Sequence, residues 1–291
     1  MRREAEDMTA AADFQRQGFQ GRSVLVTGGT RGIGRVIAET FLAAGAEVAV
    51  GGRTPPDTPP SAGGRTARFL AADVREPGQA AGLVEAAAEP SGRLDVLVNN
   101  AGGAPSAEAA EVSPRFVAKV VGLNLLAPFH TAQPANRIMR RQPEGGWIVN
   151  IGSVAAYDPQ PGTAAYTAAK AGLLGLTRAL ALEWAPKVRV NHVTAGPVRT
   201  EAADEVFGPA GADAVDRVVP MRRMAGPADI ARACLLLASD PYITGADLAV
   251  HGGGEVPARY LVLPDRPGPG EQGRGRGAPE AHPRNGPRKR K

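Results

Sequence analysis

The fold is decided by residues 23–34, which read SVLVTGGTRGIG. Residues 23–27 form a short, largely β-branched run that predicts a strand, and the glycines that follow have the spacing G-x3-G-x-G. Residues 35–44 then show helical periodicity that ends at Gly45. A strand, a glycine loop and a helix in this order bring backbone N–H groups and the positive end of the helix dipole to a phosphate. A tight structural turn is the competing interpretation, because the spacing departs from G-x-G-x-x-G.

Outward from this stretch, apolar runs alternate with helical patterns as far as residue 250. The predicted helices cover residues 163–184, with Thr163 as N-cap, and residues 230–238. The predicted strands cover residues 47–50, 68–71, 94–98, 147–151, 188–193 and 248–250. Strands that alternate with helices indicate βαβ units, and continuously apolar strands indicate a sheet covered on both faces. The sequence therefore predicts a Rossmann-type, doubly wound parallel α/β sheet in three layers.

Composition and charge set the domain boundaries. The chain has 291 residues, of which 43% are hydrophobic, and a net charge of +5. Residues 264–291 hold eight Arg/Lys and three Asp/Glu, and the rest of the chain holds 26 of each sign. We expect a flexible extension over residues 1–20, a single domain over 21–260, and a disordered, basic Pro/Gly-rich tail over 264–291. The tail is interpreted as solvated, with nucleic-acid binding through it as the alternative.

Several classes of protein are disfavoured by composition. A single cysteine, Cys234, excludes an intrachain disulfide, and four histidines with one cysteine predict no metal site. The charged N-terminus lacks the apolar core of a secretory signal, and the apolar stretch 234–238 is too short for a membrane span. We therefore expect a cytoplasmic protein with no membrane partner.

The end of the second predicted strand bears on the cofactor. In dinucleotide-binding folds an acidic residue there binds the ribose 2′-hydroxyl, whereas an arginine suits a 2′-phosphate. Here the strand runs into Gly51, Gly52 and Arg53, and Arg31 in the glycine loop offers a second cation. NADP(H) is thus favoured over NAD(H). Two merely solvated arginines are the alternative, and Asp57 lies nearby among prolines.

A second constellation carries the chemistry. Tyr166 and Lys170 are four residues apart in the predicted helix 163–184 and share one face. Ser153 follows the predicted strand 147–151, at the end of the sheet where such folds bind ligands. A lysine cation one turn away favours the phenolate, and a pKa lowered by about three would correspond to about 4 kcal/mol. Tyr166 would then serve as general acid/base.

Five ordered motifs together resemble the short-chain dehydrogenase/reductase family, in its single-domain branch, from about Gly21 to Glu255. They are the glycine loop from Thr27 to Gly34, Asp73-Val74, Asn99-Asn100-Ala101-Gly102, the tetrad Asn124, Ser153, Tyr166 and Lys170, and the segment Asn191 through Thr200. Ile243-Thr244-Gly245 and Gly252-Gly253 also match the family. Within it, 3-oxoacyl-carrier-protein reductases look most similar.

The resemblance implies a carbonyl/alcohol oxidoreductase. Tyr166 would exchange a proton with the substrate oxygen, Lys170 would assist it and bind the nicotinamide ribose, and Ser153 would orient the substrate. Asn124 would bend its helix and hold a water molecule. Tyr157 is added as a candidate substrate contact. The implied cofactor contacts are Gly28, Thr30, Arg31, Gly32, Ile33, Gly34, Arg53, Asp73, Val74, Asn100, Ala101, Gly102, Tyr166, Lys170, Gly196, Val198 and Thr200.

The resemblance also implies a homodimer or homotetramer, formed through the helices near residues 114–140 and 163–184. Departures from the family are Ala195 where proline is usual, His251 where aspartate is common, and the proline-rich loop 54–66. His130 and His192 are interpreted as structural. The alternative function is a catalytically silent nucleotide-binding regulatory or interaction protein, against which the complete tetrad argues.

Overall fold

The computed structural model describes residues 18–201 and 211–254, which belong to one compact unit. The predicted tail 264–291 and nearly all of the predicted extension 1–20 lie outside these residues, so both stay predictions. Within the described part of the chain, no helix is both long and apolar enough to cross a membrane.

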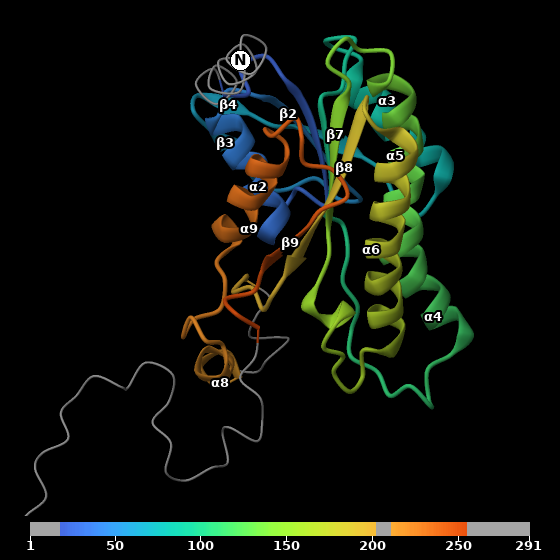
Figure 1. The fold of residues 1–291 in the computed structure, drawn as a ribbon, viewed down its shortest axis with the longest axis vertical. Coiled ribbons are helices and arrows are strands. Elements are labelled where there is room, and N and C mark those ends of the chain that lie inside the picture. Colours follow the sequence, from blue (N-terminus) through green and yellow to red (C-terminus); the bar gives the residue numbers. More distant parts are fainter. Residues whose placement is uncertain (1–17, 202–210, 255–291) are drawn as a thin grey trace, which may run out of the picture. The chain divides into compact units, whose positions relative to one another are not determined.

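Seven strands form one sheet in which every pairing is parallel (Figure 1). Their order across the sheet is β5 (Arg68–Ala71), β2 (Glu47–Gly52), β1 (Ser23–Thr27), β6 (Val96–Asn99), β7 (Gly146–Ile151), β8 (Val188–Ala195) and β9 (Asp247–Val250). The chain winds outward from β1 in one direction and from β6 in the other. The doubly wound fold predicted from the alternation is confirmed, and its switch point between β1 and β6 is where such sheets bind ligands.

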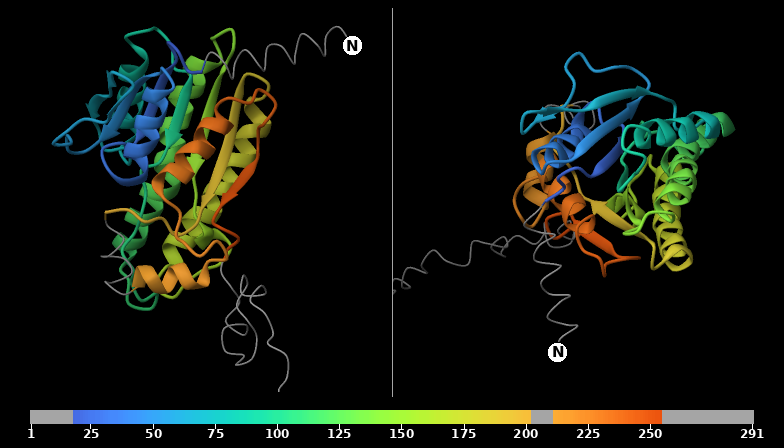
Figure 2. Two further views of the ribbon diagram at one scale, coloured as in Figure 1. Left: turned by 90° about the vertical axis from the view of Figure 1, so that its left-hand side faces the viewer. Right: turned by 90° about the horizontal axis from the view of Figure 1, so that it is seen from above.

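Helices cover both faces of the sheet (Figure 2). α2 (Gly32–Ala43) and α9 (Pro227–Leu237) pack together on one face, and α3 (Pro77–Ala88), α5 (Ala127–Met139) and α6 (Ala164–Trp184) cover the other. Strands β1, β6, β7 and β8 are buried along their whole length. Alternate residues therefore enter two separate cores, with Val24 and Val26 in one and Leu25 in the other.

Shorter elements complete the described chain. α4 (Pro114–Val121) runs directly into a π-helical turn, η1 (Gly122–Leu126), which continues as α5. A 3-10 turn, η2 (Val154–Ala156), follows β7, and α8 (Gly211–Val218) precedes α9. The proline-rich loop contains a small hairpin of β3 (Ser61–Ala62) and β4 (Arg65–Thr66).

The predicted elements exist, with shifted ends. α2 begins at Gly32 because the glycine loop itself forms its first turn, and α9 begins at Pro227, since proline suits a first helical turn. Thr163 holds the N-cap position of α6 without a side-chain cap bond, because its hydroxyl donates to the Gln160 carbonyl at 2.6 Å.

Candidate functional site

The glycine loop forms an open cradle for an anion. Gly28 and Gly32 have φ of 63° and 53°, a backbone conformation that suits glycine. A Cβ on Gly34 would lie 2.3 Å from the Gly28 carbonyl oxygen, so only glycine lets the helix approach the loop. The N-terminus of α2 has no side-chain cap and no acidic residue in its first turn. These backbone features fit the pyrophosphate of a dinucleotide.

Asn100 and Ala101 hold this loop from the neighbouring strand. The Asn100 amide donates to the carbonyl oxygens of Thr27 and Gly28 at 3.0 and 3.1 Å. The backbone N–H groups of Asn100 and Ala101 both donate to the Thr27 hydroxyl, at 3.0 and 3.1 Å. The predicted motif after β6 therefore lies beside the cofactor cradle, and the Asn100 side chain shapes that cradle.

The predicted segment after β8 reaches the same loop. A Cβ on Gly32 would lie 3.7 Å from the Thr200 methyl carbon. Gly196 packs against His251, whose Cα would be 2.7 Å from a Cβ at that glycine. Val198 forms an isolated parallel bridge with Ala225. The structure thus brings Thr200 of this segment to the glycine loop, and β8 continues through the unusual Ala195.

Arg31 and Arg53 are exposed at the other end of the cradle, and no described residue provides either side chain with a partner. Thr30 lies against the end of β2, since a Cβ on Gly52 would be 3.3 Å from its methyl carbon. Two cations lie at this end of β2, and its last residues, Gly51 and Gly52, carry no carboxylate, as the 2′-phosphate interpretation requires.

Asp73 is less available than predicted. Its carboxylate accepts from Arg75 Nε at 2.9 and 3.1 Å, and Arg75 Nη2 also donates to it. The Arg75 side-chain hydrogen bond is the largest cause that lowers the pKa of Asp73, with the more distant Arg53 adding to it. The neighbouring Val74 is buried. Sequence reasoning missed Arg75, whose spacing two residues from an aspartate was the only signal.

Ser153, Tyr166 and Lys170 meet at the carboxyl end of β7. Ser153 lies close enough to Tyr166 for its hydroxyl to lower the pKa of the phenol. Lys170 Nζ lies 5.7 Å from the centre of the Tyr166 ring and donates to the Ile151 carbonyl oxygen at 2.7 Å. The four-residue spacing thus places both side chains on the face of α6 that covers the sheet.

Asn124 lies in the π-helical turn, as its predicted bending of the helix requires. Its Oδ1 accepts from the Gly103 N–H at 2.8 Å, and its Nδ2 donates to the carbonyl oxygens of Gly103 and Val120 at 3.0 and 2.9 Å. A Cβ on Gly102 would lie 2.9 Å from Asn124 Oδ1 and 3.2 Å from Lys170 Nζ. Gly102 therefore fills the narrow space between the two side chains.

The electrostatics of this group differ from the sequence-based expectation. Burial raises the pKa of Tyr166, and the neighbouring Ser153 hydroxyl opposes that rise. Burial also lowers the pKa of Lys170 to about 8. The prediction that the lysine cation lowers the tyrosine pKa is wrong for this structure. Lys170 is itself desolvated, and the hydrogen bond it makes goes to Ile151 rather than to the phenol.

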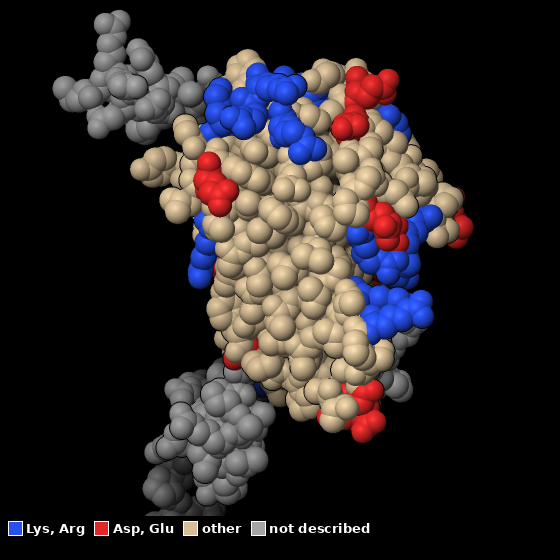
Figure 3. Space-filling model, turned by 90° about the vertical axis from the view of Figure 1, so that its right-hand side faces the viewer, with Lys and Arg blue, Asp and Glu red and all other residues tan. Residues whose placement is uncertain are grey.

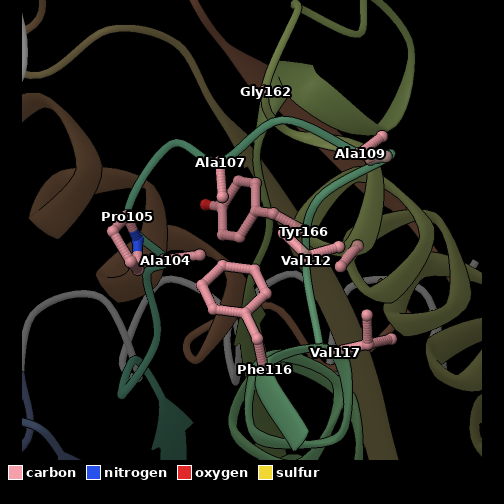
Figure 4. Close-up of a pocket in the computed structure, with 11 residues that line it drawn as sticks. Ala104, Pro105, Ala107, Ala109, Val112, Phe116, Val117, Gly162 and Tyr166 are labelled. Atoms are coloured by element: carbon pink, nitrogen blue, oxygen red, sulfur yellow. The ribbon is translucent and has the colours of Figure 1, made fainter. Parts of the chain in front are cut away.

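An apolar cavity of about 230 Å³ adjoins Tyr166 (Figure 4). Apart from Tyr166, its lining side chains carry no polar atom; they are Ala104, Pro105, Ala107, Ala109, Val112, Phe116, Val117, Gly162, Ala164 and Ala165. Tyr157, predicted as a substrate contact, is not among the residues that line this cavity, and its hydroxyl donates to Asp247. Among the described residues, no group of three His, Cys, Asp or Glu side chains could hold a metal ion.

Comparison with known proteins extends these observations. A family model described as Enoyl-(Acyl carrier protein) reductase matches residues 28–255, which contain every predicted catalytic and cofactor-binding residue. The chain is 36% identical to D-threitol dehydrogenase of Mycolicibacterium smegmatis, covering 86% of this chain and 98% of that protein. It is 35% identical to L-rhamnose 1-dehydrogenase (NAD(P)(+)) of Azotobacter vinelandii, covering 80% and 96%. Ligand-free aldohexose dehydrogenase of Thermoplasma acidophilum superposes with a TM-score of 0.75 at 30% identity, covering 81% and 94%.

Proposed function

The chain belongs to the short-chain dehydrogenase/reductase family, and from that membership we propose an NADP(H)-dependent oxidoreductase that interconverts a carbonyl and a secondary alcohol. The family uses NAD(P)(H). The observation that carries the proposal is the grouping of Ser153, Tyr166 and the buried Lys170 beside an apolar cavity.

The proposed mechanism divides the work among these side chains. When bound, the nicotinamide supplies or accepts the hydride. In the reductive direction the Tyr166 phenol donates its proton to the substrate oxygen, while the Ser153 hydroxyl hydrogen-bonds the same oxygen. A raised tyrosine pKa keeps this phenol protonated at neutral pH, which suits reduction. The remaining N–H donors of Lys170 would bind the nicotinamide ribose, and Asn124 holds the loop at Gly103 beside it.

The proposal is tested with a panel of carbonyl substrates followed by NADPH absorbance. Wild-type protein should reduce at least one of them, and Tyr166→Phe should lower kcat by about 10²- to 10⁴-fold, the usual range for a lost general acid. NADPH affinity, measured by fluorescence titration, should stay nearly unchanged. Retained turnover in Tyr166→Phe would contradict the assigned acid, and inactivity of the wild type would favour the catalytically silent alternative.

The preference for NADP(H) is supported by Arg31 and Arg53, whose side chains have no partner among the described residues, and by Gly51 and Gly52, which end β2 without a carboxylate. Arg53→Ala should weaken NADPH by about tenfold or more, because it removes a charge-assisted hydrogen bond to the 2′-phosphate. NADH affinity should barely change, which makes it the internal control. Equal losses for both cofactors would remove the argument for a 2′-phosphate site.

The substrate class is narrowed by the cavity. Its walls are formed by Ala, Val, Pro and Phe side chains, and Tyr166 is the one lining side chain that can hydrogen-bond a substrate. We propose that the substrate is a carbonyl compound whose substituent beside Phe116 is apolar. Alkyl ketones, aryl ketones and the chain of a 3-oxoacyl thioester have such a substituent. Polyols and sugars, which two relatives are named for, should be poorer substrates in the same panel.

A homodimer or homotetramer is supported by the outer face of α5 and α6, a broad area of which shows few charged side chains (Figure 3). On α6 this face presents small residues and the 86% exposed Leu182. Such a surface marks a protein–protein interface. Light scattering after size exclusion should give two or four times the 30.0 kDa chain mass, and a monomer would contradict this proposal.

A further inference from the structure

Three side chains donate to one carboxylate, Asp247, at the edge of the sheet. Its Oδ1 accepts from His192 Nδ1 and from the Thr194 hydroxyl, both at 2.7 Å. Its Oδ2 accepts from the Tyr157 hydroxyl at 2.5 Å. The parallel register pairs His192 with Asp247, and Thr194 lies two residues further along β8, so all three face the same side of the sheet. Tyr157 comes from the turn that follows Ser153.

The His192 ring is fully buried and has one nitrogen without a partner. Its Nδ1 bonds a carboxylate, which only accepts, so Nδ1 carries the proton and Nε2 of the neutral ring does not. Nε2 is buried and has no hydrogen-bond partner. Burial lowers the pKa of His192, which keeps the ring neutral at pH 7 despite Asp247, and the positive charges of Lys170 and Arg178 act in the same direction.

The unpartnered edge of this ring lies against Gly152. A Cβ on Gly152 would be 2.0 Å from His192 Cε1 and 2.1 Å from Nε2, so only glycine fits beneath the ring. Gly152 is the residue immediately before Ser153. His192 therefore determines how far the backbone can move at the point where the chain leaves β7 for the catalytic serine.

Tyr157 holds the other end of the same segment. It follows the 3-10 turn that begins at Ser153, whose Oγ accepts the Ala155 N–H at 3.2 Å. Tyr157 is about half exposed, at 51%, and its hydroxyl donates to Asp247. One carboxylate is thus linked to both sides of Ser153, through a ring packed on Gly152 and through the hydroxyl of Tyr157.

We propose that Asp247 is a positioning residue which, through His192 and Tyr157, holds segment 152–157 so that Ser153 Oγ meets the Tyr166 hydroxyl. The inference rests on the proposed function only for the consequence that Ser153 acts on substrate. Neither Asp247 nor His192 contacts the cavity beside Tyr166, so both act through the serine segment rather than on the substrate.

The kinetic test uses Tyr157→Phe and Asp247→Asn in the wild-type protein and in Ser153→Ala. Each should lower kcat about tenfold in the wild type, the effect of a lost hydrogen bond to a charged group, with NADPH affinity unchanged. In Ser153→Ala the same changes should leave the residual rate within about twofold, because the group they position is gone. A tenfold loss in both backgrounds would overturn the proposal, since it would show general destabilisation.

A second measurement needs no activity. Amide hydrogen exchange in residues 153–158 should be about tenfold faster in Tyr157→Phe than in the wild type, while β7 should be unchanged. Tyr242→Phe is the matched control, because Tyr242 is 97% exposed and removing its hydroxyl should change neither region. Unchanged exchange in residues 153–158 would overturn the positioning role. If wild-type protein reduces no substrate but exchange responds as expected, the proposed function fails and the positioning inference stands.

Discussion

Two buried charged side chains lie at opposite ends of the sheet, and their surroundings differ. Asp95, just before β6, is fully buried and accepts from the Ser23 N–H at 2.8 Å, from Arg22 at 3.0 Å and from Arg93 at 2.5 Å. Lys170, at the other end, is also buried, yet its amine has one hydrogen bond, to Ile151. A charged group whose hydrogen-bonding capacity is filled by the protein has a structural role. An amine beside a cavity that still has N–H donors without partners is available to a ligand.

Removal of the Asp95 carboxylate should lower the stability of the fold more than removal of a partly exposed carboxylate does. Asp95→Ala removes the acceptor of the Ser23 N–H and leaves two guanidinium groups facing each other. We therefore expect a loss of about 3–5 kcal/mol in the free energy of unfolding. Urea denaturation measures this. Glu39→Ala is the control, because its ion pair with Arg35 is partly exposed and should contribute less than about 1 kcal/mol. Similar losses of stability in both variants would contradict the structural role assigned to Asp95.

The buried Lys170 amine should make the stability of the protein depend on pH. The pKa of Lys170 is lowered from 10.5 to about 8 in the folded state, so between these values the unfolded chain holds more protons. The free energy of unfolding therefore rises with pH across this window, by on the order of 3 kcal/mol at about 1.4 kcal/mol per pH unit. Below pH 8 the charged amine is destabilising by that amount.

Lys170→Met isolates this effect, because methionine fills similar space without a charge. Urea denaturation of both ligand-free proteins from pH 7 to 10.5 should show the difference in stability between wild type and variant shifting in favour of the wild type as pH rises. A difference independent of pH would mean that the lysine is solvated, and the contrast with Asp95 would then lose its basis.

Local sequence patterns were sufficient to predict the glycine loop and the shared helix face of Tyr166 and Lys170. Both depend on backbone periodicity, in which a strand exposes its end and a helix repeats its face about every four residues. The same patterns failed for α3, whose sequence PGQAAGLVEAAA is rich in small residues and carries little apolar contrast between its faces. Helix existence there is decided by packing against β1, β5 and α5.

The roles of residues that act through distant contacts could not be predicted. Asn124 reaches Gly103, 21 positions away, and Asp247 reaches Tyr157 across 90 positions. Tyr157, expected as a substrate contact, hydrogen-bonds Asp247, while His192, expected to be structural, packs against the residue before Ser153. No spacing in the sequence relates these positions, because a parallel sheet joins strands that are remote along the chain.

The succession of the seven strands of the sheet, the glycine loop and the shared helix face of Tyr166 and Lys170 were determined by the amino-acid sequence alone, since each depends on neighbouring residues. Which groups are desolvated was decided only by the tertiary structure. Burial raises the pKa of Tyr166, lowers that of Lys170 and leaves His192 Nε2 unpartnered against Gly152. Desolvation depends on everything packed around a group, and that environment exists only once the sheet and both helical layers have assembled.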